Sequence, residues 1–324
     1  MNVIAIRSHR HFVTLATLGF CALIATLLYQ FVNVNPKYFE YAMSLRLPRL
    51  AAIVTAAVAV AGASLVFQTV IRNHIVTPCL LGMNALYLLI HTIIAFVFGA
   101  TSLLATHPIA AFLIDLVVMG LMGLLVYGVL FRKTGGNVLY ILLIGTVLTT
   151  FFTSIQSSLV RMMDPNEYDA LLSSLTASFT NVSAPLIAPS VLILALLAWG
   201  LKKDLAMLDL LSLGREHAIS LGVDFDAVTR RLLVGVALAI AVATALVGPI
   251  SFLGLITANL SRRLLQTYRH GPLILGSVLI GIVVLTGGQV IVEHLAAFSI
   301  PVSVFITLAG GIYFLYLILR SRGL

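Results

Sequence analysis

Charged side chains are scarce in this sequence. Asp, Glu, Lys and Arg make up only 9% of its 324 residues, whereas soluble domains carry about 25%. Such a chain cannot cover a water-facing surface, so a soluble fold is excluded. The sequence is 60% hydrophobic and has a mean hydropathy of +1.12, which indicates that its solvent is lipid.

The sequence also lacks the usual signatures of catalysis and metal binding. It contains no G-x-x-x-x-G-K-[ST], H-E-x-x-H or G-x-S-x-G, so it has no Walker A loop for ATP. Its two cysteines are too few for a disulfide framework or a Cys-based metal site, and no cluster of nucleophile, base or metal ligands favours a membrane enzyme. We therefore expect no catalytic residue, no metal and no cofactor bound by this chain. Four histidines are expected at the surface or at an interface: His91, His107, His270 and His294.

Long apolar runs predict an all-α integral membrane protein. About 20 apolar residues span the ~30 Å hydrocarbon core as a helix, and these runs are continuous rather than alternating as in a β-barrel. We expect a bundle of about ten transmembrane helices in a single domain, residues 1–324, with no soluble domain. The expected spans are 12–32, 50–71, 79–98, 108–131, 139–160, 184–201, 228–247, 249–265, 272–292 and 301–319.

The distribution of Lys and Arg predicts the orientation of these spans. With both termini in the cytoplasm, fifteen of the nineteen basic residues fall on the inside, as the positive-inside rule requires. The net charge of +8 reflects this topology and does not indicate nucleic-acid binding. The basic residues before the first apolar run are followed by no small-residue cleavage site, so we expect a retained span.

A polar insert at 209–224, DLLSLGREHAISLGVD, interrupts the apolar sequence. Its charged residues require water or a partner protein around them. Gly222 fits the stop signal of a short helix, and apolar residues at 218, 219 and 221 suit a groove on a cytoplasmic partner. We expect this segment to be a docking helix.

Two arginines precede the second span on the outer side. Arg46 and Arg49 in R-L-P-R lie one helical turn apart, and Pro48 suits the first turn of a helix. Arginine binds carboxylates bidentately, which favours a docking point for acidic side chains of an external protein. The alternative is that both side chains extend to lipid phosphates.

The stretch GASLVFQTVIRNHIVTPCLLG at 62–82 places a polar amide, Gln68, inside a span, where it is costly unless paired. Irregular backbone at membrane depth is tolerated where it lines a cavity or is buried in protein. A gate near Asn73 and Ile75 is one interpretation, and an ordinary tight loop between helices is the other. The outer segment 161–183 also has two interpretations: an interfacial or re-entrant helix, or a surface loop.

These motifs resemble the permeases of the iron-siderophore and vitamin B12 family of ATP-binding cassette (ABC) importers. The resemblance covers nearly the whole chain. It depends on four elements in order: R-L-P-R at 46–49, Q-x-x-x-R-N with P-x-x-L-G at 68–82, L-G-x-x-x-A-x-x-L-G-V at 213–223, and G-P-I-x-F-L-G-L at 248–255. It implies the type II ABC importer permease fold and a place in the inner (cytoplasmic) membrane of a bacterium.

The resemblance also implies partners and roles. The permease would import a ferric siderophore, work with a second permease and two cytoplasmic ATPases that hold ATP and Mg, and receive cargo from a periplasmic or lipid-anchored binding protein. Arg46 and Arg49 would meet glutamates of that binding protein, and the inner gate would involve Gln68, Asn73, Ile75 and Asn137. The coupling helix at 209–224 would contact the ATPase through Leu213, Gly214, Arg215, Glu216, Ala218, Leu221, Gly222 and Val223.

Departures from the family pattern narrow the resemblance. Ala258-Asn259 stands where many members have Pro-His, and the run ITANLSRRLLQTYRH at 256–270 resembles a branch in which two different permeases pair and carry catecholate or mixed siderophores. This favours a heterodimer over a homodimer. Asp115 inside the fourth span supports an alternative, a proton-coupled secondary transporter that acts alone, although a hydrogen-bonded structural carboxylate is the simpler interpretation.

Overall fold

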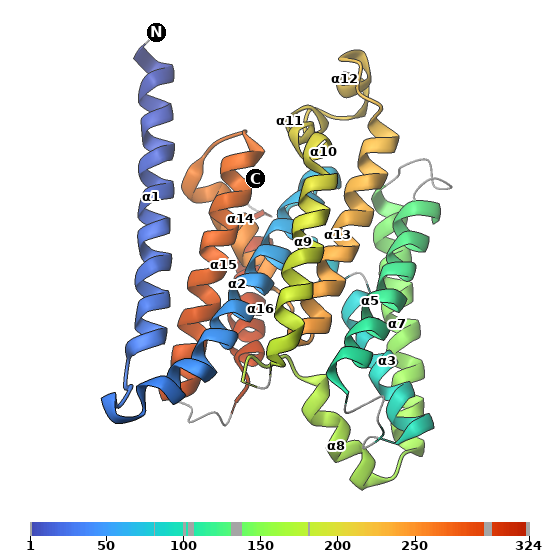
Figure 1. The fold of residues 1–324 in the computed structure, drawn as a ribbon. Coiled ribbons are helices and arrows are strands. Elements are labelled where there is room, and N and C mark those ends of the chain that lie inside the picture. Colours follow the sequence, from blue (N-terminus) through green and yellow to red (C-terminus); the bar gives the residue numbers. More distant parts are fainter. Residues whose placement is uncertain are drawn as a thin grey trace.

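The computed structural model describes residues 2–80, 82–99, 102, 107–130, 138–180, 182–294 and 300–321. Within these ranges the chain is helical and has no β-strand. A helix coincides with each of the ten predicted spans, so the all-α membrane fold is confirmed. In chain order (Figure 1) these helices are α1 (Asn2–Phe31), α2 (Phe39–Val70), α3 (Met83–Phe98), α5 (Pro108–Gly123), α7 (Val138–Met162), α9 (Ile187–Gly200), α13 (Phe225–Val247), α14 (Leu253–Leu265), α15 (His270–His294) and α16 (Val302–Ser321).

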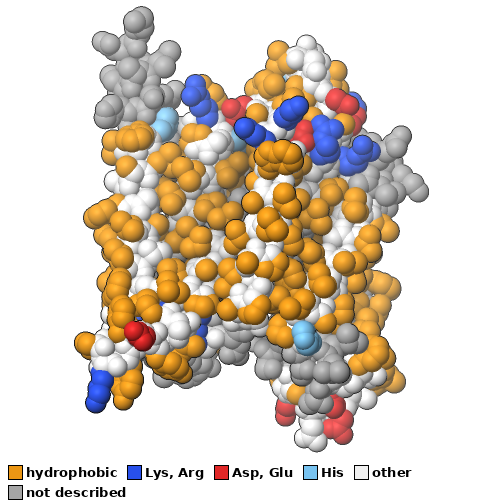
Figure 2. All heavy atoms as spheres, in the orientation of Figure 1, with side chains coloured by type: hydrophobic (Ala, Val, Ile, Leu, Met, Phe, Trp, Pro, Cys, Tyr) orange, Lys and Arg blue, Asp and Glu red, His pale blue; other side chains and the backbone are white. Residues whose placement is uncertain are grey.

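Six of the described helical stretches are long and apolar enough to cross a membrane: His11–Phe31, Pro36–Val70, Pro108–Tyr127, Leu143–Met162, Phe225–Val247 and His270–His294. Three shorter apolar helices lie among them. Figure 2 shows hydrophobic side chains over the middle of the molecule and charged ones gathered towards its two ends. Large apolar residues such as Phe12 and Trp199 are exposed, as expected for side chains that face lipid tails.

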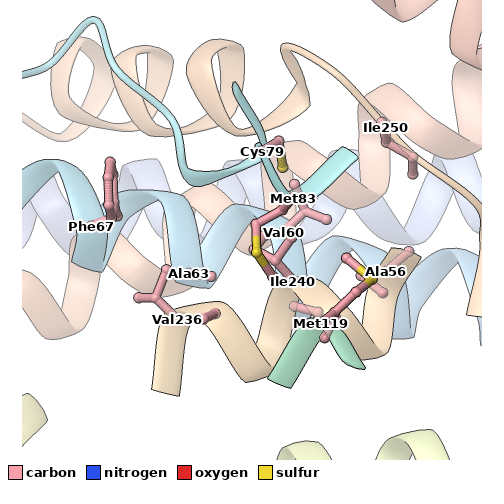
Figure 3. Close-up of a cluster of buried hydrophobic side chains, with 14 of the residues drawn as sticks. Ala56, Val60, Ala63, Phe67, Cys79, Met83, Met119, Val236, Ile240 and Ile250 are labelled. Atoms are coloured by element: carbon pink, nitrogen blue, oxygen red, sulfur yellow. The ribbon is translucent and has the colours of Figure 1, made fainter. Parts of the chain in front are cut away.

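The core is centred on α2 and α13, which pack against each other and against neighbours on both sides. Small residues along α2, including Ala56 and Ala63, allow close approach of other helices, and Figure 3 shows Val236 and Ile240 of α13 in the same cluster. A Cβ added at Gly254 of α14 would overlap the Ser64 side chain of α2. A glycine is therefore required where α14 crosses α2.

The helix α2 begins earlier than predicted and changes the place of Pro48. Asn35 caps a short 3-10 turn, Pro36–Tyr38, by accepting a hydrogen bond from the Lys37 N–H, and the chain enters α2 at Phe39. Pro48 therefore lies inside the helix and not in its first turn, as we expected. Because proline has no N–H, the backbone bond of that turn is absent.

Polar elements occupy the two ends of the bundle. The segment 161–183, predicted to face outward, contains an amphipathic helix, α8 (Pro165–Leu175), whose N-terminus is capped by Asp164, so of its two interpretations the structure has the helix. At the opposite end, on the side of the N-terminus, lie α10 (Lys202–Ala206), α11 (Leu208–Leu211) and α12 (Arg215–Ser220) (Figure 1). The polar insert at 209–224 contains most of α11 and all of α12, and α10 precedes it.

Candidate functional site

The helix α12 is bounded by two glycines whose backbone φ angles are positive. Gly214 has φ +104° and Gly222 has φ +84°, values that other residues adopt only with strain. The Gly222 N–H donates to the Ile219 carbonyl at 2.9 Å, and the Val223 N–H donates to the Ala218 carbonyl at 3.0 Å. This pair of bonds is the Schellman motif, so the predicted helix stop at Gly222 is confirmed.

The apolar residues of α12 divide between two faces. Ile219 and Leu221 are 48% and 59% exposed, and Leu213 just before the helix is 53% exposed. Ala218 is fully buried, so it does not share the outward surface that we expected for it. It belongs instead to the buried apolar cluster of the bundle. The exposed face of α12 thus presents isolated apolar side chains beside the exposed Glu216 and His217.

Pairs of charged or polar side chains tie α10 and α11 to the membrane helices. The buried Asp204 of α10 accepts two hydrogen bonds from Arg231 of α13, at 2.8 and 2.9 Å. Asp209 of α11 accepts a bond from the His270 backbone N–H at 2.9 Å and lies 2.5 Å from its Nδ1. These contacts fix the short helices to α13 and α15.

Two further contacts hold α12 itself. Arg215 donates to Asp226 of α13, with the closest N···O distance at 2.7 Å. The Arg72 guanidinium lies so close to Gly214 that a Cβ there would stand 3.0 Å from Nη1. Movement of α12 is thus connected directly to α13, while Arg72 at the end of α2 lies beside Gly214, just before its first residue.

Below this end of α2, Gln68 and Thr69 contact a single arginine. Arg262 of α14 donates from Nη1 to the Gln68 Oε1 and from Nη2 to the Thr69 hydroxyl at 3.2 Å. Gln68 is fully buried, and its carbonyl oxygen is satisfied by this contact. The sequence indicated the costly amide but not its partner, because 194 residues separate the two.

The predicted gate residues Asn73 and Ile75 form a local turn. The Asn73 Oδ1 accepts a hydrogen bond from the Ile75 N–H at 2.9 Å, and the next carbonyl, of His74, accepts one from Asn259 of α14 at 2.8 Å. Partial desolvation and then the charge of Arg262 lower the pKa of His74, which keeps its imidazole neutral at pH 7. Asn137 lies outside the described residues.

The outer arginines are engaged within the chain. Arg46 donates from Nη1 to the carbonyls of Tyr29, Gln30 and Val32 at 2.8 to 3.0 Å, which caps the C-terminal end of α1. Its Nη2 lies 3.5 Å from Glu293 of α15.

Arg49 lies on the same side of α2, as predicted, with its Nη1 4.0 Å from Glu293. The side chains of Arg46 and Arg49 are 14% and 19% exposed. The two arginines therefore do not form a freely exposed pair, and the sequence analysis missed Glu293 as their partner.

The carboxylate of Asp115 is paired inside the bundle. Its Oδ2 lies 3.0 Å from the His91 Nε2 of α3, and the His91 ring lies beside that of Tyr87, with the centroids 4.3 Å apart and the planes tilted by 45°. His91 and His270, expected at the surface or at an interface, have side chains only 12% and 8% exposed and each faces an aspartate, so neither lies on the open surface. Among the described residues no group of three His, Cys, Asp or Glu side chains could hold a metal ion.

Comparison with known proteins agrees with this architecture. Residues 11–320 match the FecCD transport family. The chain is 42% identical to the petrobactin import system permease protein YclO of Bacillus subtilis, over 88% of this chain and 90% of that protein. It is 33% identical to the petrobactin import system permease protein FatC of Bacillus anthracis, over 96% and 88%.

A solved structure described as an inward-facing conformation of a metal-chelate type ABC transporter has the same fold. The TM-score is 0.77 at 22% sequence identity, and the match covers 96% of this chain and 99% of that one. The fold is thus that of an ABC importer permease.

Proposed function

Because the chain belongs to the FecCD transport family, we propose that it is a permease subunit of an ATP-driven importer of ferric chelates. It is a multi-pass protein of a bacterial membrane, and the proposal places α10–α12 and both termini on the cytoplasmic side. The observation that carries the proposal is the set of ties from α10–α12 to α2, α13 and α15. A push on α12 from a partner reaches α13 through the Arg215–Asp226 contact, and the neighbouring α10 and α11 carry it to α13 and α15.

The partner proposed for α12 is a cytoplasmic ATPase that holds ATP and Mg, while this chain binds no cofactor. The contact surface is Leu213, Ile219 and Leu221, with Arg215, Glu216 and His217 around them. Gly214, Gly222, Val223 and Ala218 have a supporting role, because they set the shape of α12. Two such ATPases and a second permease, favoured as a different chain, complete the proposed complex.

The cargo proposed is an iron-siderophore complex of the catecholate type. Support comes from the names of two relatives, YclO and FatC, both petrobactin import permeases. Petrobactin loaded with iron is therefore the first cargo to test. In this proposal Gln68, Asn73, Ile75 and Asn137 belong to the cytoplasmic gate, where the Asn73 turn and the Gln68–Arg262 contact set the position of the loop.

The proposal gives the outer arginines a docking partner, a binding protein outside the membrane. Arg46 is committed to the α1 carbonyls, so Arg49 is the better candidate for a carboxylate from that protein. Glu293 holds the two arginines in place until docking. A carboxylate of the binding protein would then compete with Glu293 for Arg49.

The function of α12 is tested by reversing the chemistry of its exposed face. Ile219→Glu with Leu221→Glu is expected to reduce uptake of ⁵⁵Fe-petrobactin by at least tenfold in cells that depend on this permease, with normal amounts of the protein in the membrane. Tyr268→Glu changes a still more exposed apolar residue, at 76%, of the same end outside α12 and serves as the control. Undiminished uptake by the α12 variant would refute the proposed contact.

A further inference from the structure

A polar cavity lies where α2, α11, α14 and α15 meet, at the end of the molecule that carries α10–α12. Its volume is about 320 Å³, far more than one water molecule requires. It is lined by Gln68, Thr69, Arg72, His74, Ser212, Arg262 and His270. Among these residues there are two arginines and no carboxylate.

Hydrogen-bond donors outnumber acceptors in this cavity. Arg262 donates hydrogen bonds to the Gln68 Oε1 and to the Thr69 hydroxyl oxygen, so both acceptors are already engaged. The Thr69 hydroxyl itself donates to the Leu65 carbonyl at 2.9 Å. The Gln68 Nε2 is left without a partner among the described residues, although Gln68 is fully buried. A buried N–H donor without an acceptor is costly, and the cavity that Gln68 helps to line has room for a ligand with several acceptor oxygens.

The positive charge of the cavity also favours a ligand with acceptor oxygens. Arg215, Arg231 and Arg46 each pair with a carboxylate, but no ion pair joins Arg262 to one within the described part of the chain. The nearby carboxylate of Asp209 is engaged by His270. Water can satisfy the free donors but does not offset the charge of a partly buried guanidinium.

We propose that this cavity binds an oxyanion of the phosphate type, held by Arg262, the Gln68 amide and Arg72. Arginine and amide donors match phosphate oxygens in geometry and charge. A bound phosphate would join the ends of α2 and α14 to the residue that supports Gly214 at the start of α12. The oxyanion can come from solution or from the headgroup of an anionic phospholipid, and this inference does not depend on the import function.

Binding is measured by thermal unfolding of the full-length chain in a non-ionic detergent, with any partners that copurify. Sodium phosphate is titrated against sodium chloride at equal ionic strength and pH. A parallel titration uses phosphatidylglycerol against phosphatidylcholine in mixed micelles. We expect a saturable rise in Tm of about 2–6 °C for one of the two phosphate sources, and which source gives it identifies the natural ligand.

Two variants make the test specific. Gln68→Glu supplies Arg262 with a carboxylate of nearly the same shape, so it is expected to raise the Tm in chloride and to abolish the response to the oxyanion. Arg262→Gln is expected to abolish the response as well. Arg263→Gln is the matched control, because Arg263 lies over the rings of Tyr313 and Tyr316 outside the cavity, and it should respond like the wild type.

The proposal is wrong if neither phosphate nor phosphatidylglycerol raises the Tm of the wild type above its control. It is also wrong if Gln68→Glu keeps the full response. Should Arg262→Gln fail to fold, Gln68→Glu still decides the outcome.

Discussion

At the scale of single residues, the side chains that sequence patterns marked as external contacts are engaged inside the chain. Arg46 donates hydrogen bonds to three carbonyls of α1 and forms an ion pair with Glu293. His91 faces Asp115, and His270 faces Asp209. Each of these partners stabilises the contact between two helices. The effect of a substitution at these positions on protein stability must therefore be measured before its effect on function is interpreted.

Substitutions of the two arginines Arg46 and Arg49 are expected to differ in their effects: the first on stability, the second on uptake. Arg46→Gln removes charge-assisted bonds to α1 that contribute about 2–4 kcal/mol together, so it should lower the Tm and the amount of protein in the membrane. Arg49→Gln removes one long ion pair and should leave the Tm within about 2 °C, while uptake of the ferric chelate falls. Measurement of Tm and uptake for both, with Lys37→Gln as an exposed control, checks this. Equal loss of stability in the two variants would show that neither is free to dock a partner.

Asp115→Asn is expected to leave chelate uptake within about twofold of the wild type. The amide can still accept a hydrogen bond from His91, so only a modest loss of stability, about 1–2 kcal/mol, should follow. Uptake assays at pH 6 and pH 8 measure the effect, and Asp115→Leu reports the cost of losing the bond altogether. A folded Asp115→Asn protein without transport would instead favour a proton-coupled transporter.

At the scale of elements, the short helix α12 owes its shape to its flanking glycines and its position to its neighbours. Leu208 and Leu211 of α11 are buried at its base, and Arg215 and Arg72 hold its start. The hydrophobic surface of α12 is small, so its orientation depends on these contacts.

Gly214→Ala and Gly222→Ala form a matched pair that tests this dependence. Both place a Cβ at positive φ, with a backbone cost of about 1–3 kcal/mol. Only at Gly214 does the Cβ also press against Arg72, since nothing lies within 4 Å of the Cβ at Gly222. Gly214→Ala is therefore expected to reduce uptake several times more than Gly222→Ala at a similar Tm. Equal uptake by the two variants would show that the Arg72 contact does not transmit motion.

At the scale of the whole molecule, the bundle could be predicted from the sequence because lipid imposes a length and a composition on every spanning helix. The stop at Gly222 was also readable, since a positive φ favours glycine. The partner of Gln68 and the Glu293 contact were not, because they join residues 194 and more than 240 positions apart. The start of α2 was missed because Glu40, Arg46 and Arg49 interrupt the apolar sequence of its first turns.

In the proposed complex, this chain moves its cargo only together with an ATPase that engages α12. The most direct measurement is affinity purification of the tagged chain from its native membrane in mild detergent, with mass-spectrometric identification of the proteins that accompany it. We predict an ATPase and a second, different permease, both retained by the wild type, and loss of the ATPase from the Ile219→Glu, Leu221→Glu variant. Recovery of the chain alone, active in vesicles without ATP, would contradict the account.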